Sequence, residues 1–324
     1  MPSSLALQQY LPHVSRIAYG CMGLGGGWDD NPVSQQDIDQ AREVIEVALE
    51  AGINLFDHAD IYTFSKAEQV FGEVLKQSPA LRDKMYIQSK CGIRFEDEHG
   101  AGRYDFSQSW VQHSVEQSLQ RLNCEQLDVL LLHRPDPLMQ LDELATTLNS
   151  LHQAGKIAHL GVSNMNTAQI AYLQSALSLP IVANQIEMSL AKTDWLDDGI
   201  AVNTPASANT GFNTGLLEYC QMHNIQLQAW GCLAQGAFSD AGLESEQKNI
   251  RKTSEYVRQL ANDYGVSSEA IVLAFLLRHP AAIQPVIGTT NIQRIKACAQ
   301  ATNVTLTREQ WYNLYVLSRG EALP

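Results

Sequence analysis

Four side chains in this sequence have the combined chemistry to protonate a carbonyl oxygen: Asp57, Tyr62, Lys90 and His133. Reducing a carbonyl group requires a hydride at its carbon and a proton at its oxygen. A tyrosine can donate that proton, but its ordinary pKa of about 10 makes it a weak acid near neutrality. A nearby ammonium lowers that pKa, a carboxylate can hold the ammonium in place, and a histidine can orient the carbonyl oxygen or relay the proton.

Each of these residues also has a purely structural explanation. A tyrosine after a strand is usually a packing residue, a lone histidine is more often a satisfied core residue, and an Asp–Lys pair can serve stability alone. A different chemistry is also open, in which the Lys90 amine forms a Schiff base with a carbonyl substrate. Their joint placement along the chain favours a shared site for proton donation.

The elements that must position these residues follow a regular alternation. Short apolar runs predict buried strands at 16–22, 53–57, 84–90, 127–133, 156–163, 181–188, 225–231 and 282–288. Segments with helical spacing lie between them, at 34–52, 65–76, 107–122, 141–155 and 166–177. Uniformly apolar strands that alternate with helices indicate a parallel sheet covered by helices. A doubly wound open sheet meets that description too, but eight strands favour a closed (β/α)8 TIM barrel, a single domain over residues 1–324.

In such a barrel, functional residues collect at the carboxyl ends of the strands. The sequence passes this test: polar or aromatic residues lie at or near the ends of six predicted strands, namely Asp57, Lys90, His133, Ser163 with Asn164, Gln185 and Trp230. Burying a lysine and an aspartate in adjacent apolar strands is costly unless they pair. The polar segment 193–213 is predicted to form a long loop on the same face.

Composition excludes several other classes of protein. The 324 residues are 45% hydrophobic and carry a formal net charge of −13, which argues against binding to nucleic acid or to anionic membranes. No run of about 18 apolar residues predicts a membrane span, and the N-terminus lacks the pattern of a signal peptide, so we expect a cytoplasmic protein. Six scattered cysteines without a CxxC pair indicate reduced thiols and no metal site.

Several segments resemble the aldo-keto reductases, above all the bacterial general oxidoreductases of that family that carry an LLHRPDPL strand. The similar segments follow the family's order over nearly the whole chain: GINLFDHADIY (52–62), QSKCG (88–92), LLHRPDPL (131–138), GKIAHLGVSN (155–164), ANQIEMS (183–189) and IGTTNIQRI (287–295). The resemblance implies an NADPH-dependent reductase of small aldehydes or ketones, built on a TIM barrel.

The resemblance also implies a role for each matching residue. Tyr62 is the proton donor, Lys90 lowers its pKa, Asp57 pairs with Lys90, and His133 orients the carbonyl. Ser163, Asn164 and Gln185 bind the nicotinamide carboxamide, and Trp230 stacks on the ring. The other implied cofactor contacts are Gly20, Cys21 and Met22 after the first strand, Gly231, Cys232, Leu233, Gln235 and Gly236 at the pyrophosphate, and Gly288, Thr289, Thr290 and Arg294 at the 2′-phosphate.

The sequence departs from the family pattern at several positions. Gly288 stands where the family often has a lysine, and Cys298 where it often has an asparagine, so use of NADH is also possible. His58 replaces a common threonine. The 193–213 segment is longer than usual, so the carbonyl substrate, like the oligomeric state, cannot be carried over from the family.

Two motifs and one alternative function complete the hypotheses. Tyr62 and Lys66 match a YxxxK pair, but the glycine fingerprint that accompanies such a pair is misplaced, so Lys66 is expected to face solvent. Gly23–Gly27 lacks the helix and acidic residue of a Rossmann loop and is expected beside the nicotinamide. The alternative to an enzyme is an NAD(P)H-binding, redox-sensing regulatory subunit with little turnover.

Overall fold

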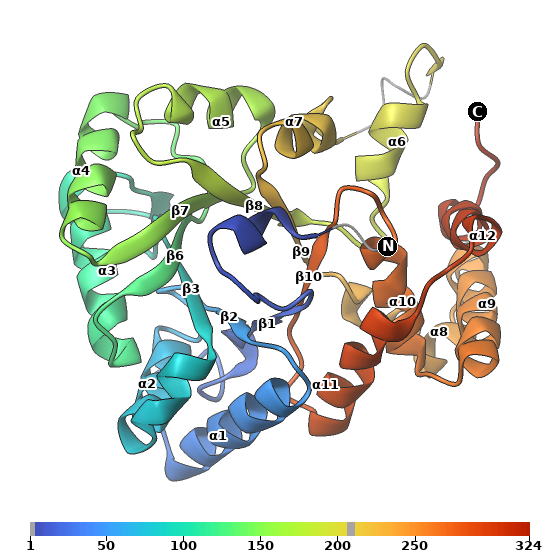
Figure 1. Ribbon diagram of the computed structural model, residues 1–324, viewed down its shortest axis with the longest axis horizontal. Helices are drawn as coiled ribbons and strands as arrows, with labels where there is room; N and C mark the ends of the chain where they lie inside the picture. The colour runs from blue at the N-terminus through green and yellow to red at the C-terminus, as the bar shows by residue number, and fades with distance from the viewer. Residues whose placement is uncertain (1–3, 206–210) are drawn as a thin grey trace.

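The computed structural model describes residues 4–205 and 211–324, which fold around a closed barrel of eight parallel strands (Figure 1). The order around the barrel is β1-β10-β9-β8-β7-β6-β3-β2. The TIM barrel predicted from the alternating apolar pattern is therefore confirmed. The strands are β1 (Ala18–Gly20), β2 (Leu55–Asp57), β3 (Tyr86–Cys91), β6 (Leu127–Leu132), β7 (Ile157–Ser163), β8 (Ile181–Glu187), β9 (Gln226–Trp230) and β10 (Gln284–Ile287).

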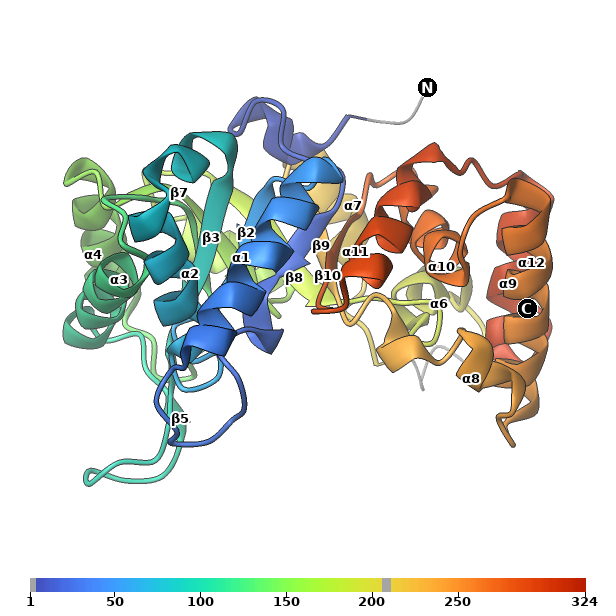
Figure 2. The ribbon, with the colours of Figure 1, turned by 90° about the horizontal axis from the view of Figure 1, so that it is seen from below.

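Helices cover the outside of the barrel because each presents its apolar side to the strands. The larger helices are α1 (Gln35–Glu50), α2 (Lys66–Gln77), α3 (Gln108–Leu122), α4 (Leu141–Gln153), α5 (Thr167–Gln174), α7 (Leu216–Met222), α9 (Lys248–Tyr264), α10 (Ser268–Leu277), α11 (Ile292–Ala299) and α12 (Arg308–Arg319). The predicted starts at Ser34 and Asn166 are confirmed, since both side chains accept a hydrogen bond from the helix backbone. Helices α9 and α12 pack together beyond the barrel wall (Figures 1 and 2).

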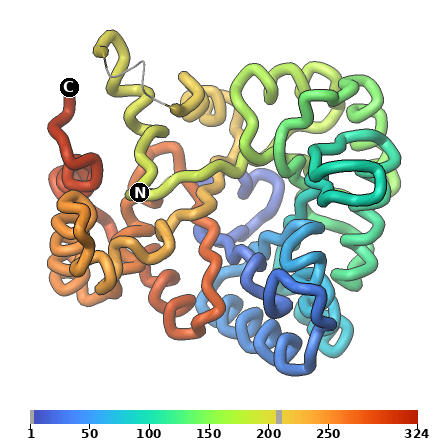
Figure 3. The backbone as a smooth tube through the Cα atoms, turned by 180° about the vertical axis from the view of Figure 1, so that it is seen from behind, coloured from blue at the N-terminus to red at the C-terminus, as the bar shows by residue number. Residues whose placement is uncertain are grey.

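The two ends of the barrel differ. A 3-10 helix at Ala6–Gln9 closes the amino end, where Leu5, Leu7 and Leu11 pack on the inward side chains of the strands. The opposite end carries the β1–α1 loop and a small hairpin of β4 (Ile93–Arg94) and β5 (Arg103–Tyr104), as Figures 2 and 3 show. The sequence did not predict that hairpin. The open end of the barrel is thus the one at which the strands finish.

The segment 193–213 differs in part from its prediction. Helix α6 (Asp194–Ile200) occupies its first third, so the prediction of a loop was wrong for these residues. Two neighbouring carboxylates of α6 hold hydrogen bonds to other parts of the chain. Asp197 accepts one from the Tyr315 hydroxyl, and Asp198 accepts one from the Thr214 hydroxyl. Residues 206–210 of this segment lie outside the described residues.

Two further features of the described residues bear on function. No single helix among residues 4–205 and 211–324 is both long and apolar enough to cross a membrane, although α9 and α10 together, bent by 95°, meet the length and composition required. In the same part of the chain, no group of three or more His, Cys, Asp and Glu side chains is placed to hold a metal ion.

A layer of glutamine side chains crosses the barrel interior. The Gln88 amide donates to the Asp57 carboxylate (2.6 Å) and to the Gln228 carbonyl oxygen (2.9 Å). Gln228 donates in turn to Gln284 (3.0 Å) and accepts from Gln185 (3.2 Å). All four glutamines are buried, so their hydrogen bonds to one another replace those to water. This layer, which we call the glutamine layer, forms the floor beneath the open end of the barrel.

Candidate active site

Strands β2 and β3 bring Asp57 and Lys90 together inside the barrel. The Lys90 ammonium lies 2.7 Å from an Asp57 carboxylate oxygen, 3.0 Å from the Tyr62 hydroxyl and 2.9 Å from the His58 carbonyl. Three acceptors match the three protons of an ammonium, so this buried cation is fully satisfied. The burial cost of Lys90 and Asp57 is met by their mutual attraction and by these hydrogen bonds.

Tyr62 is held by an unusual turn between β2 and α2. The three residues after it, Thr63, Phe64 and Ser65, all have positive φ angles (48°, 54° and 70°) although none is glycine. Such conformations cost of order 1–3 kcal/mol each and persist only where the surroundings enforce them. The Thr63 hydroxyl donates to the Leu24 carbonyl (2.9 Å), which ties the turn to the β1–α1 loop. This turn keeps the Tyr62 ring over the barrel mouth.

His133 follows β6 directly and faces Tyr62, with 6.1 Å between the ring centroids. Its backbone N–H donates to the Cys91 carbonyl (2.9 Å), and its Nδ1 is buried without a hydrogen-bond partner. Burial, together with the positive charges of Lys90 and Arg134, lowers the pKa of His133 to about 2. The imidazole is therefore neutral at physiological pH, a state in which one ring nitrogen can donate a hydrogen bond to a carbonyl oxygen.

The electrostatics of Tyr62 differ from the prediction. Burial raises the pKa of Tyr62, Lys90 lowers it and Asp57 raises it, and the net result is a pKa above the ordinary value of 10. Lys90 does act in the predicted direction, but a net lowering of the pKa was wrong for the chain by itself, because burial raises the pKa most and Asp57 adds to that effect. Burial alone would lower the pKa of Lys90, but Asp57 and Tyr62 raise it above its usual range. The site thus holds a neutral phenol against a charged ammonium.

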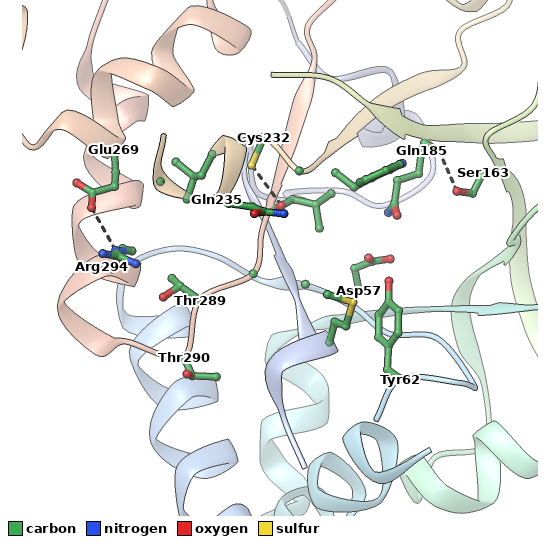
Figure 4. Close-up of a pocket in the computed structure, with 18 of the residues that line it drawn as sticks. Asp57, Tyr62, Ser163, Gln185, Cys232, Gln235, Glu269, Thr289, Thr290 and Arg294 are labelled. Atoms are coloured by element: carbon green, nitrogen blue, oxygen red, sulfur yellow. Dashed lines mark hydrogen bonds and ion pairs between the residues drawn. The ribbon is translucent and has the colours of Figure 1, made fainter. Parts of the chain in front are cut away.

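The remaining strand-end residues line the same cavity as Tyr62 and His133. The Asn164 amide donates to the Ser163 hydroxyl (2.7 Å), and the Trp230 indole N–H donates to the Asn164 carbonyl oxygen (3.2 Å). Gln185 points into the cavity from β8, near Ser163 (Figure 4). These bonds fix a set of amide and hydroxyl groups opposite Tyr62.

The cavity has a volume of about 750 Å³ and extends from Tyr62 to Arg294 (Figure 4). Nearly all of the predicted cofactor residues line it: Gly20, Met22, Ser163, Asn164, Gln185, Trp230, Gly231, Cys232, Leu233, Gln235, Gly236, Gly288, Thr289, Thr290 and Arg294. Cys21 is buried and is not among the lining residues, and Cys298 is buried as well. Lys90 lies behind Tyr62 rather than in the wall.

Other residues of the cavity wall were missed by sequence reasoning. Trp28, from the β1–α1 loop, and Arg134, which directly follows His133, line the end near Tyr62. Glu269, from the first turn of α10, lines the other end and lies 3.2 Å from Arg294. Of these three residues, Arg134 alone could have been found from the sequence, because it directly follows a histidine at the end of a predicted strand.

Lys66 corrects another prediction. It was expected to face solvent, but its side chain is buried and its ammonium donates to the Asp29 carboxylate (2.8 Å) and to the Asn31 carbonyl (3.3 Å). The β1–α1 loop packs closely on the start of α2, where Gly25 has a φ of +80° and leaves no room for a Cβ beside Lys66. The loop covers Lys66, which the helical pattern of α2 could not reveal.

A second buried carboxyl lies next to the site. Asp60 is buried, and one of its oxygens has no hydrogen-bond partner. Burial, with a contribution from the Glu68 carboxylate, raises the pKa of Asp60 to about 8. In the unfolded chain an aspartate has a pKa of about 3.9, so between these two values the folded protein keeps a proton that the unfolded chain releases. The stability contributed by this group is therefore lost as the pH rises from about 4 to 8.

Replacing Asp60 by asparagine should remove this pH dependence. We expect the gain in the free energy of unfolding to be larger at pH 8 than at pH 5, by roughly 3–4 kcal/mol. Urea unfolding at the two pH values measures it, with the exposed Asp83→Asn as the matched control. A gain of equal size at both pH values would show that Asp60 is ionised in the folded protein.

Comparisons of the sequence and of the fold with known proteins agree with one another. A family model described as the aldo/keto reductase family matches residues 16–317. The chain is 37% identical to a 6-dehydroglucose reductase of Agrobacterium fabrum, with 95% of each chain covered, and 36% identical to the oxidoreductase YdhF of Escherichia coli, with 86% and 88% covered. The fold resembles a glycerol dehydrogenase of Gluconobacter oxydans (TM-score 0.76, 24% identity, 95% and 93% covered). It also resembles an aldo-keto reductase of Klebsiella pneumoniae solved with NADPH (TM-score 0.71, 24% identity, 96% and 92% covered).

Proposed function

The chain belongs to the aldo/keto reductase family, and on that premise we propose that it reduces small aldehydes or ketones to alcohols with NADPH, using Tyr62 as the proton donor. The observation that carries the proposal is the chain of contacts from Asp57 through Lys90 to the Tyr62 hydroxyl, at 2.7 and 3.0 Å. Tyr62 lines the same cavity as the amide groups of Asn164 and Gln185.

The residues of the cavity fit a nicotinamide dinucleotide. Ser163, Asn164 and Gln185 offer the hydroxyl and amide groups that a carboxamide can pair with, and Trp230 offers a ring on which it can stack. The turn after β9 contains Gly231 and Gly236, both with positive φ angles (66° and 82°), and its backbone N–H groups suit a pyrophosphate. Thr289, Thr290 and Arg294 lie at the far end, where a guanidinium matches a 2′-phosphate.

The mechanism follows from the charge states of the chain's own residues. When bound, NADPH supplies the hydride that is added to the carbonyl carbon. Tyr62 transfers its proton to the carbonyl oxygen, and the phenolate that this leaves is stabilised by the ammonium of Lys90. Neutral His133 donates a hydrogen bond that orients the same oxygen. Tyr62 then recovers a proton from solvent, and the products are an alcohol and NADP⁺.

A direct assay tests the proposal. Purified protein mixed with NADPH and a panel of small aldehydes should show loss of absorbance in the reduced nicotinamide band, with one alcohol formed per NADPH consumed. The alternative function, a redox-sensing subunit, predicts bound NADPH without turnover on any member of the panel. A covalent adduct on Lys90 trapped by borohydride would instead support Schiff-base chemistry.

Cofactor preference should depend on the pairing of Arg294 with Glu269. Replacing Arg294 by alanine is expected to weaken NADPH binding roughly 10- to 100-fold and to leave NADH binding nearly unchanged, because hydrogen bonds between charged groups contribute about 1.5–3 kcal/mol. Replacing Glu269 by glutamine should instead tighten NADPH binding severalfold, since it frees the guanidinium from a competing carboxylate. Fluorescence titration with both cofactors measures the dissociation constants. Equal losses for NADPH and NADH in Arg294→Ala would show that this residue does not bind the 2′-phosphate.

A further inference from the structure

Arg134 is a cation with no anionic partner in the wall of the cavity. It follows His133 at the end of β6 and is half-buried. Within residues 4–205 and 211–324 it makes no hydrogen bond and no ion pair, and its guanidinium lies 6.0 Å from the centre of the Trp230 ring. The other arginine of this cavity, Arg294, is neutralised by Glu269. A half-buried charge without a counter-ion is costly, which suggests that a bound molecule supplies one.

The charges around Arg134 indicate the charge that this bound molecule should carry. Among the lining residues that the structure describes, Asp57 is the one carboxylate at this end of the cavity, and Lys90 already neutralises it. His133 is neutral, and Trp28 and Ile61 contribute apolar surface. The end of the cavity near Tyr62 therefore carries one net positive charge in a protein whose formal net charge is −13.

We propose that Arg134 binds an anionic group, a carboxylate or a phosphate, on the carbonyl substrate, and so makes acidic aldehydes and ketones the preferred substrates of this reductase. The proposal rests on the proposed function. A guanidinium pairs with either anion through two parallel hydrogen bonds, which fixes the orientation of the substrate as well as its affinity. Arg134 directly follows His133, whose ring is 6.1 Å from that of Tyr62, so an anion held there belongs to a molecule whose carbonyl can reach Tyr62.

Matched pairs of substrates isolate this interaction. 4-Carboxybenzaldehyde and 4-formylbenzamide have nearly the same shape and differ in charge, and glyceraldehyde 3-phosphate compared with glyceraldehyde tests phosphate. We expect kcat/KM to favour the charged member of at least one pair by roughly 10- to 100-fold. Arg134→Gln should reduce that ratio to about one, mainly by raising KM, and Arg134→Lys should keep part of it. Arg258→Gln, on the exposed side of α9, is the control and should change nothing.

Three results would overturn the proposal. The first is a ratio that is the same in Arg134→Gln and in the parent protein. The second is an equal loss on charged and neutral substrates, which would indicate that Arg134 acts through His133 or through the fold. The third is a larger dissociation constant for NADPH in Arg134→Gln with an unchanged ratio of kcat/KM between charged and neutral substrates, which would assign Arg134 to cofactor binding.

The same experiment separates this proposal from the proposed function. Reduction of the neutral aldehydes, with no Arg134-dependent preference, would refute the role of Arg134 and leave carbonyl reduction intact. If no aldehyde is reduced, carbonyl reduction fails, and calorimetry with 4-(hydroxymethyl)benzoate and 4-(hydroxymethyl)benzamide decides on Arg134 alone. Tighter binding of the benzoate that Arg134→Gln abolishes would support the anion site, whereas equal binding would reject it.

Discussion

Tyr62→Phe should lower kcat for aldehyde reduction by a factor of roughly 10²–10⁴, the usual contribution of a positioned general acid. The substitution removes one oxygen atom, which accepts a hydrogen bond from Lys90 at 3.0 Å, and keeps the ring that faces His133. The cavity wall that is proposed to bind NADPH remains in place, so the dissociation constant for NADPH should change little. Stopped-flow measurement of NADPH oxidation and a binding titration give the two quantities.

The control for this variant is Tyr264→Phe, because the Tyr264 hydroxyl donates to the Thr305 carbonyl (2.9 Å) on the outside of the barrel. It should leave kcat unchanged. A Tyr62→Phe protein with the parent rate would reject Tyr62 as proton donor. A loss of NADPH binding that parallels the loss of rate would show that the phenol serves the cofactor and not the proton.

Lys90→Met should affect both stability and rate. Removing one partner of a buried ion pair leaves Asp57 with an uncompensated charge, and this typically costs about 3–5 kcal/mol in the free energy of unfolding. The rate should fall with it, because the phenolate that forms at Tyr62 then has no cation 3.0 Å away. Urea unfolding and aldehyde reduction measure the two effects on one preparation.

A second substitution separates the two effects. In Lys90→Met/Asp57→Asn the buried charge is gone, so most of the lost stability should return while the rate stays low. Lys84→Met, on the exposed 3-10 helix before β3, is the control. Recovery of the rate together with the stability would mean that Lys90 supports the fold only and has no part in the chemistry.

The sequence was sufficient to predict the barrel and most residues of its open end. Buried parallel strands are continuous apolar runs, and polar residues at their ends, such as Asp57 and Trp230, stand out against that background. The predicted boundaries therefore lie within two residues of those observed for all eight strands. At the end of the first strand, Cys21 and Met22 belong to a short 3-10 helix instead.

What could not be predicted depends on contacts between distant segments. Glu269 and Arg294 lie on different helices, and nothing in either helix indicates that they meet in the cavity. Lys66 fits the exposed face of α2 until the β1–α1 loop covers it. The net pKa of Tyr62 depends on a balance between burial, Lys90 and Asp57, and residue types and spacing alone cannot decide which of these contributions is larger.

The glutamine layer gives the barrel interior a fixed direction. An ionised carboxylate can only accept hydrogen bonds, so Asp57 determines which way the amide of Gln88 faces. Gln88 then orients Gln228, and the side-chain oxygen of Gln228 accepts one N–H of the Gln185 amide. Turning over any one amide would set donor against donor or acceptor against acceptor. One N–H of Gln185 is thus committed to Gln228, so the orientation of the Gln185 amide at the cavity wall depends on a carboxylate on the opposite side of the barrel.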